Sequence, residues 1–215
     1  YTFSIEQNPD FLNPYINRGN AYASNNNFDD ALSDLNKAIQ IDRNSLPALR
    51  SRGFVYHLSG NYDRALDDYE LALKSDSNDA ITYFMRGQTN NLLGEIDRAL
   101  MDLNKAIQLA PNYGDSYYSR GNAYFIKGDY DRALMDYNRA IEINPYDYST
   151  YHNRGLIYNS VGRYDLAIRD YSEAIQIEPN LSSIYIDRGK TYARILDYDS
   201  AIADYNRAIQ LLIGT

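Results

Sequence analysis

Few side chains in this sequence could carry out acid–base or nucleophilic chemistry, and they are spread along the chain. The two histidines are His57 and His152, and neither stands in an HExxH helix, a glycine-rich phosphate loop or a nucleophile elbow. Paired acids such as Asp29 and Asp30 could act as a general acid and base, but we expect them at helix starts and on helix surfaces, where their role is structural. We therefore expect no enzyme activity, no cofactor and no metal site within these 215 residues.

Composition excludes several further classes of protein. The chain has no cysteine, which excludes disulfides, thiolate zinc sites and cysteine nucleophiles. It carries 21 Lys and Arg residues against 29 Asp and Glu residues, and the net charge of −8 has the wrong sign for a phosphate-binding surface. No apolar run is long enough to span a bilayer, and no signal peptide is visible. We expect no nucleic-acid partner, no membrane partner and a cytoplasmic location.

The elements that would position functional side chains follow from a period of 34 residues, which is repeated six times. Apart from Asn90 at position 11 of the third unit, apolar and aromatic residues stand at positions 4, 8 and 11 of the units and again at positions 20, 24 and 27. These spacings of three and four place them on one face each of two consecutive amphipathic helices. Position 8 is always Gly, and position 20 is always Ala. The glycines are Gly19, Gly53, Gly87, Gly121, Gly155 and Gly189, and the alanines are Ala31, Ala65, Ala99, Ala133, Ala167 and Ala201.

Turn and cap residues agree with two helices in each unit. An Asp stands at the start of every second helix, where a carboxylate complements the helix dipole. All six Pro residues lie at the expected helix boundaries, since a proline inside a helix would cost about 3 kcal/mol. In four units a Gly stands between the two helices, as expected for a helix C-terminus. These are Gly60, Gly94, Gly128 and Gly162.

This pattern resembles the tetratricopeptide repeat family, in which aromatic, Gly, aromatic, Ala, aromatic, Ala and Pro residues follow one another in this order. One unit matches it with Tyr117, Gly121, Tyr124, Ala133, Tyr137, Ala140 and Pro145. The resemblance implies an all-α fold, a right-handed superhelical solenoid of antiparallel helix pairs whose first helices line the concave side. Asn90 departs from the pattern, because it replaces a core aromatic residue. The predicted units are residues 12–45, 46–79, 80–113, 114–147, 148–181 and 182–215, and residues 1–11 are predicted to be the remnant of an upstream unit's second helix.

The two ends predict a fragment of a longer array. The chain begins in the middle of a unit, and its sixth unit stops at Thr215 without a polar helix to cover its last apolar face. Solenoids normally need such a cap. We therefore expect either further repeats outside this sequence or self-association through uncapped end faces. The last end face is predicted to present Ile202, Tyr205, Ile209 and Leu212.

Two regular features are predicted to be scaffold. An Arg precedes the Gly of every unit, and an Asp occupies position 23 of every unit, which predicts a ladder of Arg–Asp ion pairs. A row of anion-binding arginines is the functional alternative. The Gly at position 8 is predicted to lie against the Ala at position 20, so that Gly121 would contact Ala133.

The candidate binding site follows from the resemblance, which implies that ligands touch positions 2, 5, 6, 9, 12 and 13 of the first helices. No basic residue stands at position 2 or 6, so the pattern with which some family members bind acidic chaperone tails is missing. The surface is instead apolar, with amide and hydroxyl side chains at its edges, which suits a peptide or an amphipathic helix. The predicted site residues are Asn20, Arg50, Phe54, Phe84, Met85, Gln88, Tyr118, Asn122, Phe125, His152, Asn153 and Leu156.

The sequence therefore predicts a non-catalytic scaffold that binds a protein or peptide ligand mainly through apolar contacts and hydrogen bonds. Two alternatives stay open. Some of the predicted site residues could pack against the neighbouring first helix without touching a ligand. The array could also be a structural self-assembly module of a larger protein, joined through end faces or grooves. The identity of the partner does not follow from the sequence.

Overall fold

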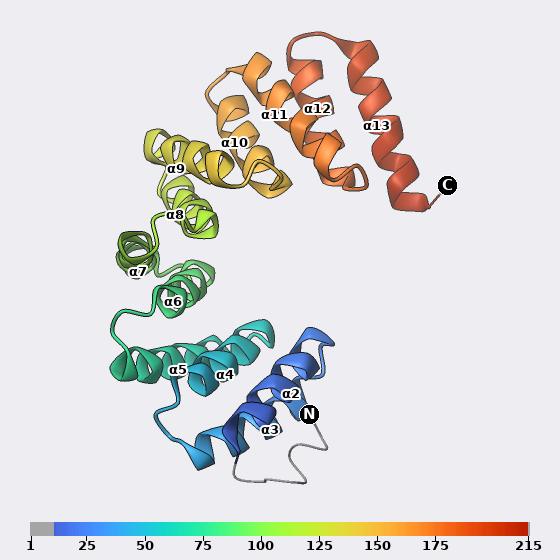
Figure 1. Cartoon of the computed structure of the whole chain (residues 1–215). Helices are drawn as coiled ribbons and strands as arrows, with labels where there is room; N and C mark the ends of the chain where they lie inside the picture. The colour runs from blue at the N-terminus through green and yellow to red at the C-terminus, as the bar shows by residue number, and fades with distance from the viewer. Residues whose placement is uncertain (1–10, 215) are drawn as a thin grey trace. The chain divides into compact units, whose positions relative to one another are not determined.

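The computed structural model of the chain describes residues 11–214, and in this range α-helix is the regular secondary structure (Figure 1). The expected helix remnant over residues 1–11 lies almost wholly outside the described residues. Each first helix of a pair has 13 residues, and each second helix has 14, except for the last, which has 16. The helices are α2 (Leu12–Ser24), α3 (Phe28–Ile41), α4 (Leu46–Leu58), α5 (Tyr62–Ser75), α6 (Ala80–Leu92), α7 (Ile96–Leu109), α8 (Gly114–Ile126), α9 (Tyr130–Ile143), α10 (Tyr148–Ser160), α11 (Tyr164–Ile177), α12 (Ser182–Arg194) and α13 (Tyr198–Ile213).

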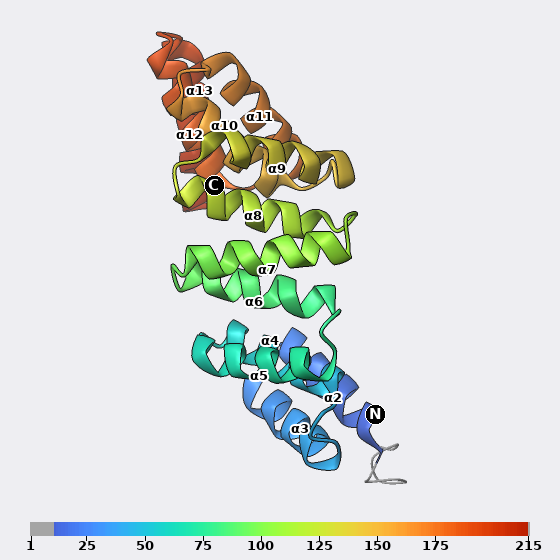
Figure 2. The ribbon, with the colours of Figure 1, turned by 90° about the vertical axis from the view of Figure 1, so that its left-hand side faces the viewer.

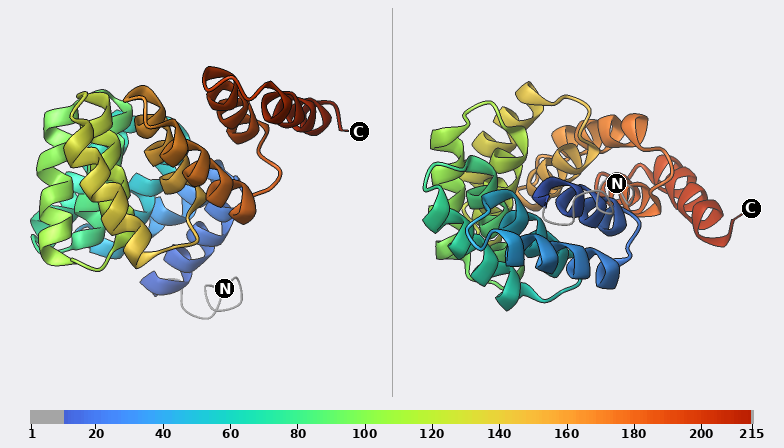
Figure 3. Two further views of the ribbon diagram at one scale, coloured as in Figure 1. Left: turned by 90° about the horizontal axis from the view of Figure 1, so that it is seen from above. Right: turned by 60° about the horizontal axis from the view of Figure 1, so that its bottom comes forward.

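The helices form antiparallel pairs within two compact units. Unit 1 ends at Pro111 and holds α2 to α7, and unit 2 begins at Asn112 and holds α8 to α13. In unit 1, α2 pairs with α3, α4 with α5 and α6 with α7; Figure 2 shows α6 and α7 side by side. In unit 2 the pairs are α8 with α9, α10 with α11 and α12 with α13, and Figure 3 shows the pairs from two further directions. The predicted all-α fold of antiparallel helix pairs is confirmed.

Within each unit, successive pairs also contact one another through their first helices. In unit 1, α2 contacts α4 and α4 contacts α6, while in unit 2 α8 contacts α10 and α10 contacts α12. Each second helix also contacts the first helix of the following pair in its own unit, as α3 does with α4 and α11 with α12. Side chains on the first helices of a unit therefore lie next to one another, which is what a binding surface built from several pairs requires.

Left-handed residues end the first helices. Gly60 has a φ of 77°, and the amide of Asn61 donates a hydrogen bond of 2.8 Å to the carbonyl of Tyr56. This bond closes a Schellman turn, and glycine adopts the left-handed conformation without a steric cost. In the first and last pairs the position is taken by Asn26, with a φ of 58°, and by Leu196, with a φ of 65°. The remaining turns use Gly94, Gly128 and Gly162.

The recurring Gly at position 8 lets the two helices of a pair pack closely. The three atoms nearest to the position that a Cβ on Gly121 would take belong to the ring of Tyr137, and the closest of them, Cε1, lies 2.6 Å away. The tyrosine reaches across the pair and lies over the bare backbone of α8. Where a shorter leucine takes the place of this tyrosine, as Leu103 does opposite Gly87, the backbone oxygen of Ala99 lies 3.3 Å from the Cβ position, so the predicted contact between Gly and the Ala at position 20 is confirmed there.

The predicted ladder of ion pairs is confirmed in all six pairs of helices. Each arginine donates from Nε and Nη2 to the two carboxylate oxygens of an aspartate on the second helix of its own pair, at distances of 2.6–2.9 Å. The aspartate side chains are only 4–8% exposed. Because these guanidinium forks already hold carboxylates, the row is architecture and not an anion site. The pairs are Arg18–Asp34, Arg52–Asp68, Arg86–Asp102, Arg120–Asp136, Arg154–Asp170 and Arg188–Asp204.

Candidate functional site

The first helices of unit 1 frame a hollow of about 560 Å³, which we call the first-helix groove. Its size lies within the range of about 300–1,000 Å³ that ligand sites span. Phe54 of α4 lines this groove and is 39% exposed. Its ring is stacked on the imidazole of His57, with 6.4 Å between the ring centroids. Four of the predicted site residues, Asn20, Arg50, Phe54 and Met85, therefore lie around one space. The groove is lined by Asn20, Ala23, Ser24, Asn26, Arg50, Ser51, Phe54, Leu58 and Met85.

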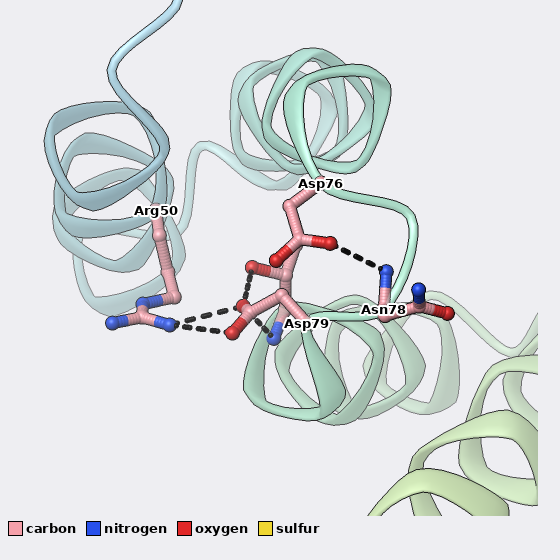
Figure 4. A network of polar contacts seen from close by, with 5 residues as sticks. Arg50, Asp76, Asn78 and Asp79 are labelled. Carbon is pink, nitrogen blue, oxygen red and sulfur yellow. Dashed lines mark hydrogen bonds and ion pairs between the residues drawn. The ribbon is translucent and has the colours of Figure 1, made fainter.

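Arg50 already has a partner within unit 1. Its Nη1 donates to both carboxylate oxygens of Asp79, at 3.0 and 2.9 Å, and Figure 4 shows the two side chains facing one another. Asp79 also caps the start of α6 by accepting a bond of 2.9 Å from the amide of Thr82. Burial would raise the pKa of Asp79, but the hydrogen bonds from Thr82 and Arg50 outweigh it and lower this pKa. The guanidinium of Arg50 therefore links α4 to the start of α6, and a ligand at this position would share the guanidinium with Asp79.

Phe84 is placed differently from the other aromatic residues of the predicted site. Its side chain is only 7% exposed, so it contributes little open surface to the groove. The equivalent position on α2 is Ile16, which is buried in a cluster with Ala48 and Val55 of α4. Ile16 therefore packs against the neighbouring first helix, which is one of the alternatives left open by the sequence. Gln88, on the same helix as Phe84, is half-buried.

In unit 2 three of the predicted site residues, together with Tyr137, form a hydrogen-bonded group, which we call the amide cluster (Tyr118, Asn122, Tyr137 and Asn153). Asn122 Oδ1 accepts from the hydroxyl of Tyr137 at 2.6 Å and from Nδ2 of Asn153 at 3.0 Å. Nδ2 of Asn153 also donates to the hydroxyl of Tyr118 at 3.2 Å. Burial is the main cause that raises the pKa of Tyr118, so the phenol stays neutral. The cluster brings together three residues that were predicted from different helix positions.

Tyr137 was missed as part of this cluster because its position marks it as core. Its ring is fully buried against Gly121, yet its hydroxyl reaches the surface group formed by the first helices. The length of tyrosine is the signal that could have identified it, since leucine at the same position has no polar atom to present. The cluster therefore links the core of the α8–α9 pair to the predicted binding surface.

The remaining predicted residues of unit 2 also make internal contacts. The ring of Phe125 packs 5.8 Å from that of Tyr130, and Leu156 packs against a buried cluster. Nε2 of His152 lies 3.0 Å from Oδ2 of Asp187. Burial would raise the pKa of Asp187, but hydrogen bonds from His152 and Lys190 lower it. His152 and Leu156 therefore have structural partners beside any role in binding.

Metal-binding and membrane-spanning features are absent from the described part of the chain. Residues 11–214 contain no group of three His, Cys, Asp or Glu side chains placed to hold a metal ion. None of the helices in this range is both long and apolar enough to cross a membrane. The other histidine, His57, has its Nδ1 2.8 Å from Oγ1 of Thr89, and burial lowers its pKa.

The last helix carries a row of exposed apolar side chains. Ile202, Ile209, Leu212 and Ile213 on α13 are all more than half exposed, while Tyr205 is half-buried. Three of the four residues predicted for the end face are thus exposed, and Ile213 adds a fourth.

Models of one protein family match most of the chain. Those described as tetratricopeptide repeat match residues 13–45, 51–79, 114–147, 148–181 and 182–211, and one described as TPR repeat matches residues 90–125. A comparison with curated proteins gave no match.

Solved structures resemble the chain over most of its length. The crystal structure of MamA is 28% identical and covers 75% of this chain and 95% of its own, with a TM-score of 0.69. YrrB, described as a TPR protein with an unusual peptide-binding site, is 28% identical over 83% of this chain and 92% of its own, with a TM-score of 0.63. Pseudomonas aeruginosa pilF is 20% identical over 95% of this chain and 93% of its own, with a TM-score of 0.85, and this likeness shows the fold alone.

Proposed function

Because the chain belongs to the tetratricopeptide repeat family, we propose that it is a protein-interaction scaffold whose first helices bind a peptide or a helix. The observation that carries the proposal is the first-helix groove, where the exposed Phe54 and Leu58 and the half-buried Met85 surround one hollow. Exposed apolar side chains gathered around a hollow are typical of peptide sites. The similarity to YrrB, which is described as a TPR protein with an unusual peptide-binding site, supports the same function.

The chemistry of the proposed ligand follows from which groups are already neutralised. Arg50 is paired with Asp79, and Asp187 is bonded to His152 and Lys190. Little uncompensated charge is left on these surfaces, so affinity would come from apolar burial and from hydrogen bonds. The amide cluster of unit 2 supplies donors and acceptors that suit a peptide backbone, although a ligand would have to exchange with bonds that the cluster makes internally.

The first test is a pair of truncations in the groove. A peptide selected by the 215-residue chain from a random library should lose about 30-fold in affinity when Phe54→Ala and Met85→Ala are combined, because buried aromatic anchors commonly contribute about 2 kcal/mol. Isothermal titration calorimetry measures the affinity, and circular dichroism checks that the helices remain. The change from about 0.05 to 0.5 M salt should alter the affinity only about two-fold.

A matched control removes apolar surface from the second helices instead. Leu71 on α5 and Met135 on α9 are both exposed. Changing each to alanine should leave the affinity of the same peptide unchanged. If the groove variant binds the selected peptide as well as the unchanged chain, or if the second-helix variant loses binding, the proposed surface is wrong.

A second candidate function is self-association, and the exposed row on α13 favours it. Apolar side chains that lie together on one helix face commonly mark an interface. We expect the sedimentation coefficient of the chain to rise with concentration and that of the variant with Ile209→Asp and Leu212→Asp to stay constant. A single coefficient for the unchanged chain up to about millimolar concentration, where weak association becomes visible, would exclude this role.

A further inference from the structure

A second hollow lies in unit 1, away from the first-helix groove, where one tyrosine of the repeated pattern is replaced. Position 11 of the first helix is Tyr in five of the six pairs and Asn90 in α6. In four of those five pairs, the guanidinium of the Arg–Asp ladder lies 5.9 Å from the centre of that tyrosine ring. These contacts are Arg18 with Tyr22, Arg52 with Tyr56, Arg154 with Tyr158 and Arg188 with Tyr192.

A second arginine approaches the ring where the second helix supplies one. In the α4–α5 pair, Arg64 lies 5.7 Å from the centre of the Tyr56 ring, which Arg52 approaches as well. In the α8–α9 pair, Arg132 lies 4.3 Å from the ring centre of Tyr124. These distances are within the range in which a guanidinium is attracted to an aromatic face. The site at position 11 is therefore built to hold a phenol ring beside arginine.

The α6–α7 pair keeps both arginines and lacks the ring. Arg86 occupies the ladder position and Arg98 the position of Arg64 and Arg132. Asn90 is too short to fill the space, and its Nδ2 donates to Asp102 at 3.2 Å. A hollow of about 280 Å³ remains, with Arg86, Asn90 and Arg98 among its lining residues.

The walls of this hollow fit a flat apolar ring. Leu66 from α5 and Met101 from α7 supply apolar surface, and Met is a favourable neighbour of aromatic rings. The volume lies just below the lower end of about 300–1,000 Å³ for ligand sites, which suits one side chain better than a drug-sized molecule. Arg98 is 71% exposed and its pair with Glu95 spans 3.8 Å, so its guanidinium can turn toward a bound ring.

The charges around the hollow select a neutral ring over an anion. Arg86 already uses Nε and Nη2 to hold Asp102. Asp67 and Glu70 of α5 also line the hollow and would repel a phosphate or a carboxylate. We call this second hollow, between Leu66, Asn90 and Met101, the side pocket. We propose that the side pocket binds the uncharged phenol ring of a tyrosine side chain on a protein partner, in the place that each neighbouring pair fills with its own tyrosine.

The test uses 4-methylphenol, which is the side chain of tyrosine, titrated into the 215-residue chain and followed by amide chemical shifts. Shifts should be largest at Asn90 and its neighbours in α5 and α7. Asn90→Tyr should fill the pocket from within and abolish these shifts while preserving or raising the melting temperature. Arg98→Gln should weaken binding about two- to five-fold, which is what the loss of an exposed cation–π contact predicts.

Matched controls isolate the pocket and the ring. Arg64→Gln, the equivalent change in the α4–α5 pair, should leave binding unchanged, and 4-methylcyclohexanol should bind more weakly than 4-methylphenol because it has no aromatic face. The inference is overturned if the folded Asn90→Tyr protein keeps the shifts, if Arg98→Gln has no effect, or if 4-methylphenyl phosphate binds more tightly than the phenol. Since no groove residue lines the side pocket, a failed peptide test in the groove would leave this result unaffected.

Discussion

Replacing Gly121 with leucine should lower the free energy of unfolding by about 3 kcal/mol, the upper end of the cost of overpacking a core. Even a Cβ at this position would lie 2.6 Å from one ring carbon of Tyr137 and 2.8 Å from another. The ring has little room to move, because it is fully buried and its hydroxyl is bonded to Asn122. Urea unfolding followed by circular dichroism measures the loss, and the shift of the midpoint is the quantity to compare.

The same substitution at Gly128 is the control. Gly128 has a φ of 75°, and no atom beyond Gly128 and its two chain neighbours lies within 4 Å of the position that its Cβ would take. Leucine there should cost only about 1–2 kcal/mol, from the left-handed backbone alone. An unfolding midpoint for Gly121→Leu equal to that of the unchanged chain would contradict the close approach of α8 and Tyr137.

The period of 34 residues predicted the helix pairs because each position is sampled six times. A single glycine such as Gly60 is a weak turn signal, but its recurrence in the same phase identifies the turn between two helices. The Arg–Asp ladder was predictable for the same reason, since an arginine and an aspartate that always accompany one another imply a pairing. Repetition therefore supplied the evidence that one occurrence could not.

The site residues were harder to predict, because the repeat pattern gives the position of a residue on its helix but not which neighbouring groups its side chain contacts. Arg50 and Phe84 both occupy position 5 and were both expected to touch a ligand. In the structure, however, Arg50 forms an ion pair with Asp79, and Phe84 is buried. Asp79 lies just before the first residue of α6, outside the helix positions at which the repeat pattern places ligand-binding residues. Such contacts depend on side-chain length and on the spacing between neighbouring helices, neither of which is periodic in the sequence.

The structural effect of a residue that departs from the repeat pattern was the hardest feature to predict from the sequence. Asn90 was visible as a replacement of a core aromatic residue, but the sequence gives no sign that the space stays open. A neighbouring side chain of different length could have filled this space. At another position of the same pair, Leu103 packs against Gly87 where most other pairs have a tyrosine beside the glycine. Only the positions of Arg86 and Arg98 around the hollow distinguish an unfilled ring site from a repacked core.

The second large effect concerns the ladder, where Asp68→Asn should lower the free energy of unfolding by about 2–4 kcal/mol. Removing one partner of a buried ion pair costs about 3–5 kcal/mol because the other charge is left without compensation. The side chain of Asp68 is 4% exposed, but that of Arg52 is 19% exposed, and water can partly solvate it, so the expected loss is somewhat smaller. Urea unfolding again measures the change.

Two further variants separate the buried charge from the general effect of altering α5. Glu70→Gln breaks the exposed pair with Lys74 on the same helix and should leave the unfolding midpoint unchanged. Combining Asp68→Leu with Arg52→Met should recover much of the lost stability, because two apolar side chains leave no uncompensated charge. If Asp68→Asn were as harmless as Glu70→Gln, the ladder would contribute geometry without stability, and its recurrence in every pair would need another cause.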